Sequence, residues 1–270
     1  MMKKILLVAI ACIIIGVIGI SQTYEKAVQT AEKGDKEDVI KNETLKNVEV
    51  KLDAGDIVVQ KSPDSSFYVK QKGDVSKQEI RIAEDGDTLK IIGEIEKGVS
   101  FDFSFYNFGF QTPTLTILVP ERSYQEIKVN SSAGQIEISN VKSDRVSVET
   151  LAGEVDLKHV TAKSVEGSTK AGEVNFKKVI GKVTAKTASG DIDIIDHDSK
   201  YDLEVSSTAG DVDITLLEKP QDAVITGQTA AGDVTIFNED NKNITIGNGS
   251  KKISGKTAAG DVTIETHSFE

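Results

Sequence analysis

The stretch VSVETLAGEVDL at residues 146–157 determines the fold class of this chain. Apolar and polar side chains alternate on both sides of Leu151-Ala152-Gly153, which is the pattern of two short strands joined by a glycine turn. The same pattern returns as VEGSTKAGEVNF at residues 165–176 and as VTAKTASGDIDI at residues 183–194. The sequence therefore contains a repeated two-strand unit, which is typical of a solenoid.

The glycine turn recurs at intervals of 19, 19, 18, 20, 22 and 28 residues. A unit of about 19 residues is too small to bury its own apolar face, so we expect successive units to stack about 4.8 Å apart. The repeat glycines are Gly134, Gly153, Gly172, Gly190, Gly210, Gly232 and Gly260, and Gly55 has a similar setting.

Stacking requires that equivalent residues form columns, and four columns are visible. Two are aliphatic or aromatic and are expected to point inward, and a third contains only Ser and Thr. The first column is Ile136, Val155, Val174, Ile192, Val212, Val234 and Val262. The second is Ile138, Leu157, Phe176, Ile194, Ile214, Ile236 and Ile264. The third is Ser131, Thr150, Thr169, Thr187, Ser207, Thr229 and Thr257.

The fourth column contains only Ala and Ser, immediately before each glycine. We expect it to face inward at a bend of the coil, where only small side chains fit. Leu at Ala171 is then predicted to destabilise the fold by overpacking, whereas Leu at the outward Ser168 is predicted to be milder. The column is Ala133, Ala152, Ala171, Ser189, Ala209, Ala231 and Ala259.

These columns predict an all-β, right-handed β-solenoid, because parallel crossovers are almost always right-handed. A β-sandwich is the alternative, although it would not require one column to stay small. We expect a signal or anchor segment at residues 1–20 and a polar spacer at 21–46. Residues 47–126 are expected to form N-terminal hairpins, and residues 127–270 the solenoid repeats.

The N-terminus has the features of an export signal or a membrane anchor. Lys3 and Lys4 precede sixteen uncharged, mostly apolar residues from Ile5 to Ile20, enough for a helix of about 24 Å. No A-x-A cleavage site follows, so we predict an uncleaved single-pass anchor with the C-terminal domain outside the membrane. Secretion after cleavage is the alternative.

Composition argues against several functions. The formal net charge of −11 argues against nucleic-acid binding, because phosphate recognition depends on clustered Lys and Arg. Cys12 is the only cysteine and lies in the apolar run, so no intramolecular disulfide or multi-cysteine metal site can form. We predict no cofactor.

Several motifs resemble a bacterial putative-adhesin domain family of unknown function. They are LTILVP at residues 115–120, Tyr124, IKVNSSAG at 127–134 and the serial Thr-x-Ala-Gly-Asp-Val-x-Ile units, and the resemblance covers about residues 45 to 266. It implies a β-strand repeat protein of the cell envelope. Family members are often membrane-tethered in Gram-positive bacteria, some are associated with envelope stress, and no established catalytic residues carry over.

The repeat also predicts a column of acidic side chains next to the glycines. We consider Asp191, Asp193, Asp211 and Asp213 weak candidates for a metal site, because hard cations prefer carboxylate oxygens. The alternative, which we favour, is that each acid accepts backbone hydrogen bonds at its own turn. The acids continue the repeat rather than interrupt it, so a glycan-acting enzyme is disfavoured and we predict no catalytic residues.

A second candidate surface is the aromatic segment FDFSFYNFGF at residues 101–110. It is expected to form a hydrophobic lid over the first rung, or else an exposed patch in which Phe105, Tyr106 and Phe108 contact lipid, glycan or protein. The sequence thus predicts a non-catalytic envelope adhesion or interaction scaffold, with an envelope protein or glycan as partner. A self-assembling solenoid polymer and a glycan-acting enzyme are the alternatives.

Overall fold

The computed structural model describes residues 36–73, 78–95 and 113–267. The predicted signal-anchor and the aromatic segment with Phe105, Tyr106 and Phe108 lie outside these residues. The described chain is all-β, with twenty-two strands in two sheets. None of its segments is a helix capable of crossing a membrane.

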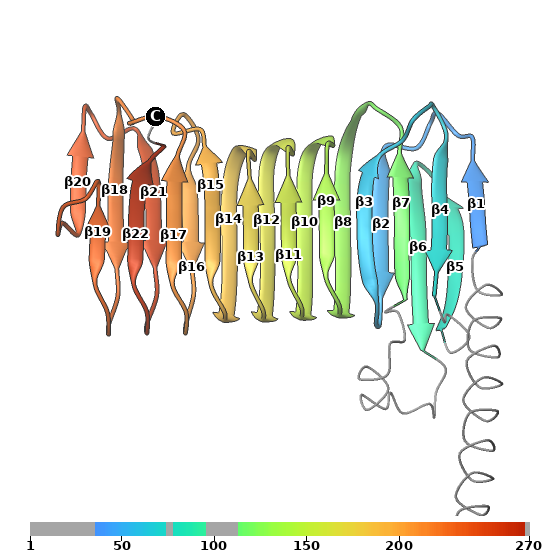
Figure 1. The fold of residues 1–270 in the computed structure, drawn as a ribbon. Helices are drawn as coiled ribbons and strands as arrows, with labels where there is room; N and C mark the ends of the chain where they lie inside the picture. Colours follow the sequence, from blue (N-terminus) through green and yellow to red (C-terminus); the bar gives the residue numbers. More distant parts are fainter. Residues whose placement is uncertain (1–35, 74–77, 96–112, 268–270) are drawn as a thin grey trace, which may run out of the picture.

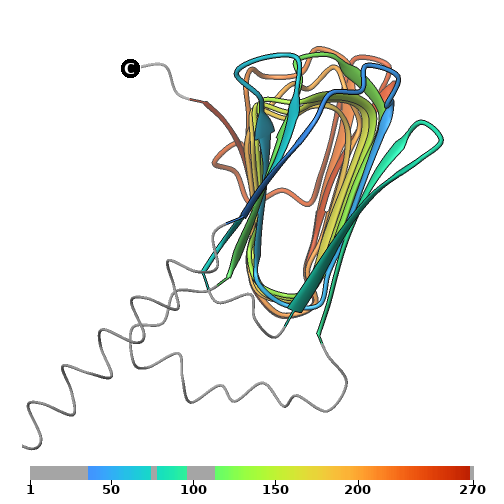
Figure 2. The same cartoon turned by 90° about the vertical axis from the view of Figure 1, so that its right-hand side faces the viewer.

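The two sheets face each other and each contains eleven strands (Figures 1 and 2). In spatial order, sheet A consists of β1 (Lys36–Ile40), β4 (Phe67–Lys72), β7 (Thr114–Val119), β3 (Asp56–Lys61), β9 (Ile136–Ser139), β11 (Val155–Lys158), β13 (Val174–Lys177), β15 (Ile192–His197), β17 (Val212–Leu216), β22 (Val262–Thr266) and β19 (Val234–Ile236). Sheet B consists of β20 (Asn243–Ile246), β18 (Ala223–Gln228), β21 (Lys251–Lys256), β16 (Leu203–Ser206), β14 (Ile180–Ser189), β12 (Thr161–Ala171), β10 (Lys142–Ala152), β8 (Ser123–Ala133), β2 (Asn47–Leu52), β6 (Thr88–Ile95) and β5 (Gln78–Asp85).

Each coil of the solenoid is one strand of sheet B followed by one strand of sheet A. From β8 to β17 these coils stack in chain order, and their strands pair in parallel. Val146 pairs with Val165 and Val155 with Val174, so a shift of one repeat superposes equivalent residues. The solenoid prediction is confirmed in this architecture, and the right-handed sense of the coil stays a prediction.

The core is a continuous apolar layer between the sheets. All members of the first two predicted columns are buried, and Ile136, Val155 and Val174 are fully inaccessible. The Ser and Thr column is also buried or half-buried, and its hydroxyls are used: Thr169 donates to the carbonyl of Gly153 at 3.0 Å, and Thr187 to that of Gly172 at 3.0 Å. Alternation along the sequence therefore predicts the interior correctly.

The expected position of the Ala and Ser column is wrong. Ala152, Ala171, Ser189, Ala209 and other members lie exposed at the corner, while the preceding Thr column is the one that points inward. Leu at Ala171 therefore meets solvent, and the overpacking expected there does not apply. The steric restriction lies one residue later, at the glycine.

The repeat glycines adopt a backbone conformation that other residues rarely reach. Gly153 has a φ of 139° and Gly172 a φ of 140°. A Cβ on Gly172 would overlap the carbonyl oxygen of Gly153 in the coil below. The glycine column therefore permits both the sharp corner and the close approach of neighbouring coils.

The two ends of the solenoid depart from chain order. The first coil, β2–β3, lies between the β6–β7 and β8–β9 coils. The last coil, β21–β22, lies between β16–β17 and β18–β19. At each end the coil nearest the chain terminus is thus inserted one place inward, and the expectation of strictly successive stacking is wrong there.

Antiparallel strands cover most of the solenoid's ends. At the N-terminal end, β5 pairs with β6, β4 with β7, and β1 with β4. At the C-terminal end, β20 pairs with β18, whereas β19 is the last strand of sheet A. β1 lies in the segment expected to be a spacer, so part of that segment belongs to the folded domain.

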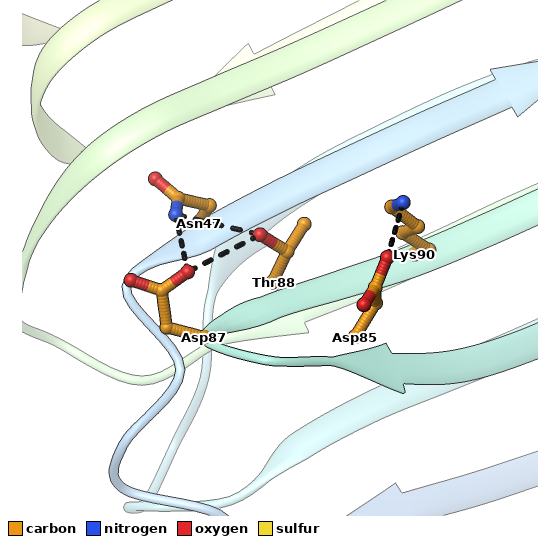
Figure 3. Close-up of polar contacts among 5 residues, drawn as sticks. All are labelled: Asn47, Asp85, Asp87, Thr88 and Lys90. Atoms are coloured by element: carbon orange, nitrogen blue, oxygen red, sulfur yellow. Dashed lines mark hydrogen bonds and ion pairs between the residues drawn. The ribbon is translucent and has the colours of Figure 1, made fainter.

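The β5–β6 hairpin is held to the start of β2 by polar side chains (Figure 3). Asn47 donates through Nδ2 to Oδ1 of Asp87 at 3.0 Å and to Oγ1 of Thr88 at 3.4 Å. Across the hairpin, the Lys90 ammonium lies 2.6 Å from the Asp85 carboxylate. The Asn47 contacts hold the hairpin to the first inserted coil, and the Lys90–Asp85 ion pair links the two strands of the hairpin itself.

Candidate functional site

The outward side of sheet A carries a continuous set of carboxylates, which we call the acidic face. Strand alternation places these side chains opposite the buried aliphatic columns. They occupy the seven consecutive coils from β9 to β19. The acidic face consists of Glu137, Glu154, Asp156, Glu173, Asp191, Asp193, Asp211, Asp213, Asp261 and Asp233, of which Asp156 is buried and the others are half-buried or exposed.

Four aspartates next to the glycines form a hydrogen-bonded ladder. The backbone amide of Asp211 donates to Oδ1 of Asp191, that of Asp261 to Asp211, and that of Asp233 to Asp261, each at 2.8 Å. The ladder follows the spatial order of the coils, including the inserted β22. The aspartates thus accept from backbone amides, as expected, but each donor belongs to the neighbouring coil and not to the acid's own turn.

In the three coils before Asp191, the residue after the glycine is a glutamate or, at Gln135, an amide. There, amide side chains form the bonds between neighbouring coils. Asn175 donates through Nδ2 to Oε1 of Glu154 at 2.6 Å. Gln135 donates through Nε2 to Oδ2 of Asp156, also at 2.6 Å. Both bonds connect neighbouring coils and orient the acceptor carboxylates on the face.

The crowding of carboxylates affects their titration. Partial burial raises the pKa of Asp193, and the charges of Asp213 and Asp191 add to this effect. Burial likewise raises the pKa of Asp213 and that of Glu154, with further contributions from neighbouring acids. A raised pKa means that the ionised form is less favourable in the folded protein than in the unfolded chain.

We therefore expect Asp193→Asn to stabilise the protein at neutral pH. The folded state favours the protonated acid, so the penalty is absent below the unfolded pKa near 3.8 and appears as pH rises through the raised folded value. A gain of about 0.5 kcal/mol at pH 7 is expected, shrinking to nothing near pH 3. Urea denaturation at both pH values measures it, with Glu204→Gln on sheet B as control. A gain that persists at pH 3 would contradict this assignment.

The predicted metal candidates are close neighbours on adjacent strands. Asp193 on β15 pairs with Asp213 on β17, and Asp191 contacts Asp211 through the ladder. Among residues 36–73, 78–95 and 113–267, no group of three or more His, Cys, Asp or Glu side chains is arranged to hold a metal ion.

Two histidines lie near the end of β15. His197 is buried, its Nε2 lies 3.1 Å from the carbonyl oxygen of Tyr201, and burial lowers its pKa. His267, which follows the inserted strand β22, lies with Nδ1 3.1 Å from Oδ1 of Asp196. The sequence does not indicate this contact, because 71 residues separate its two partners and no motif relates them.

Arg122 is a second residue that the sequence did not identify. Its guanidinium lies 5.1 Å from the ring centroid of Phe67 and 5.3 Å from that of Tyr124. It donates to the carbonyl oxygens of Glu43 at 2.8 Å and Asn42 at 3.4 Å. Burial raises the pKa of Tyr124 to about 12, and its hydroxyl donates to the carbonyl of Pro120. Arg122 thus joins the β7–β8 corner to the segment before β2.

Comparison with known families identifies the architecture. The family model Toastrack DUF4097 matches residues 45–179 and again residues 168–265. The chain belongs to this family. The resemblance inferred from the sequence is thereby confirmed, and the two overlapping matches together span the coils described above.

A solved structure has a fold similar to that of this chain. A putative adhesin from Bacteroides fragilis aligns with 86% of this chain and 97% of its own, at 16% identity and a TM-score of 0.52. A putative adhesin and a putative lipid binding protein, both from Parabacteroides distasonis, align at a TM-score of 0.42, with 14% and 16% identity. They cover 86% and 87% of this chain and 97% of their own. No curated protein matches this chain.

Proposed function

We propose that this Toastrack protein is a non-catalytic interaction scaffold of the bacterial cell envelope, displayed outside the membrane by its N-terminal apolar segment. The acidic face is the observation that carries the proposal, because it presents carboxylates in register on seven coils. Lys3 and Lys4 before the apolar run support the orientation, since positive charges stay on the cytoplasmic side. The family resemblance supports the envelope location, a Gram-positive source and a link to envelope stress.

Rigidity suits this surface for binding. The ladder and the amide bonds hold carboxylates at coil spacing, so little side-chain freedom is lost when a partner binds. The preferred partner is a protein or glycan surface with positive charges, because complementary charge favours encounter and fixes orientation. The face repeats similar residues, so it recognises a charged surface and not a single small molecule.

The same geometry disfavours chemistry on the acidic face. A glycosidase needs two carboxyl groups with different roles at a defined separation. Here Asp191 and Asp211 both accept the same kind of backbone bond, and Asp193 and Asp213 both have a raised pKa. Because their environments are equivalent, neither carboxyl group of a pair is set apart as the general acid and the other as the general base.

End-to-end polymerisation is also less favoured than a scaffold. A parallel solenoid polymer requires a parallel-stacking strand at both ends of each sheet, and the outermost strands β5, β20 and β1 run antiparallel to their neighbours. Among the described strands, only β19 ends a sheet in the parallel sense of the coils, and it has three residues. The scaffold therefore stays our proposal for the whole chain.

A membrane-impermeant cross-linker added to intact cells tests display and binding together. We expect the wild-type chain to be cross-linked to an envelope component. Changing Asp191, Asp193, Asp211 and Asp213 to Asn is expected to leave the fold intact and to reduce that product several-fold. The matched control carries four Glu→Gln changes on the outward side of sheet B, at Glu49, Glu149, Glu166 and Glu204.

Three outcomes would contradict the proposal. Cross-linking that requires lysis would contradict extracytoplasmic display. Equal loss in the Asn variant and in the sheet B control would mean that only net charge matters. Loss confined to a Phe105, Tyr106 and Phe108→Ser variant that remains folded would assign binding to the aromatic segment.

A further inference from the structure

A hollow lies at the corner where the N-terminal coil departs from the regular pattern. After β3 the chain leaves the corner toward β4, so the β2–β3 coil does not close there as later coils do. The β7–β8 connection instead arches over this position (Figure 1). The hollow has a volume of about 210 Å³, far above the roughly 10–15 Å³ that one water molecule needs.

Three successive corners and the end of β3 form the wall of the hollow. Val119, Pro120 and Arg122 come from the β7–β8 corner, and Val141 and Lys142 from the β9–β10 corner. The β11–β12 corner adds His159 and Thr161, and Lys61 lies at the end of β3. Ligand sites in proteins are concave and combine an apolar lining with a few polar groups, and this wall contains both.

The charge of this wall is opposite to that of the molecule. Lys61, Arg122 and Lys142 contribute three positive charges and Glu121 one negative charge, in a chain whose formal net charge is −11. Lys61 forms an ion pair with Glu121. Arg122 is held by two carbonyl oxygens and two aromatic rings, so none of its hydrogen bonds neutralises its charge. Within the described part of the chain, Lys142 forms no ion pair.

We propose that this hollow binds the phosphate group of a small phosphate ester. Lys142 supplies a mobile ammonium donor, Thr161 a hydroxyl and His159 an imidazole, all of which are suited to phosphate oxygens. The fixed charge of Arg122 adds attraction without moving. Val119, Pro120 and Val141 leave an apolar wall for a short carbon chain, such as glycerol, on the ester.

This site is independent of the acidic face. The hollow lies at the corner beyond the ends of β3, β7, β9 and β11, whereas the acidic face lies on the outward side of sheet A from β9 to β19. The acids of the face would repel an anionic ligand, and the hollow would repel a cationic partner. Loss of one function therefore need not affect the other.

Calorimetric titration of the full chain in neutral detergent at 0.15 M salt tests the hollow. The probes are glycerol 3-phosphate and glycerophosphoglycerol, the deacylated head group of phosphatidylglycerol. We expect saturable binding of at least one probe, weakened about tenfold or more by Lys142→Gln, since a charge-assisted contact is lost. Lys186→Gln removes the same charge from the outward side of β14 and is expected to change binding less than twofold.

The two probes identify the source of the ligand. Tighter binding of the monoester indicates a free metabolite, and tighter binding of the diester indicates a lipid head group or a polymer of phosphodiesters. Absence of saturable binding for both probes would overturn the proposal. So would equal weakening by Lys142→Gln and Lys186→Gln, because the attraction would then be unspecific.

Discussion

Gly172→Ala is expected to destabilise the solenoid by about 3 kcal/mol or more, although it adds a single methyl group at the corner. Two costs add up in this variant. The φ of 140° is strained for any residue with a Cβ, and the new methyl would overlap the carbonyl oxygen of Gly153. The hydroxyl of Thr169 donates to that carbonyl at 3.0 Å, and the amide of Gly153 donates to the carbonyl of Ala171 at 2.9 Å. The coil therefore cannot widen at one position without losing bonds along the strand.

Two controls separate these costs by urea denaturation. Gly86→Ala at the β5–β6 turn has a φ of 62° and no atom within 4 Å of the added methyl, so it is expected to cost only about 1 kcal/mol. Ala171→Leu changes the neighbouring exposed side chain and is expected to stay within about 0.5 kcal/mol. If Gly172→Ala were as mild as Gly86→Ala, the close approach of coils at the glycine column would be refuted.

The glycine and alanine columns show what sequence periodicity can and cannot predict. Alternation identified the buried columns through Val155 and Leu157, because a strand must bury every second side chain. A run of small residues such as Ala152 and Ala171 fits either a crowded inward bend or an exposed corner. Only the backbone conformation decides between them, and it places the restriction at the glycine.

The sequence also does not predict which side chains of the two sheets pack against each other. Phe176 is buried opposite Gly167, and a Cβ at that glycine would overlap the Phe176 ring. The two residues lie in different strands of the same repeat, β13 and β12. Gly167 interrupts a strand pattern in the sequence, and that pattern does not reveal which large residue the glycine accommodates.

The candidate surfaces were predictable to different degrees. The acidic face follows directly from the repeat, since Asp191 and Asp211 occupy equivalent positions. The hollow at the β7–β8 corner could not be predicted, because it depends on where the β7–β8 connection crosses the β2–β3 coil. Arg122 and Lys142 belong to different corners, and only the coil order brings them together.

Coil order at the C-terminal end is the feature that the sequence predicts least, and the continuous stack of the proposed scaffold depends on it. The eight residues Thr229–Ile236 have the same sequence, TAAGDVTI, as Thr257–Ile264. Either segment could pair with β17 through the same residues, and the sequence therefore cannot choose between them. In the structure, Val262 pairs with both Val212 and Val234.

Disulfide cross-linking of cysteine pairs in a Cys12→Ser background tests the coil order directly. Ala209, Ala231 and Ala259 are exposed, and Ala259 forms a bridge with each of the other two. Neighbouring coils are about 4.8 Å apart, within the range of a disulfide, whereas two coils span about 9.6 Å. We expect Ala209→Cys with Ala259→Cys to oxidise to near completion, as should Ala152→Cys with Ala171→Cys in the regular coils. Ala209→Cys with Ala231→Cys should remain reduced. Oxidation of the 209 and 231 pair together with a reduced 209 and 259 pair would contradict the inserted C-terminal coil.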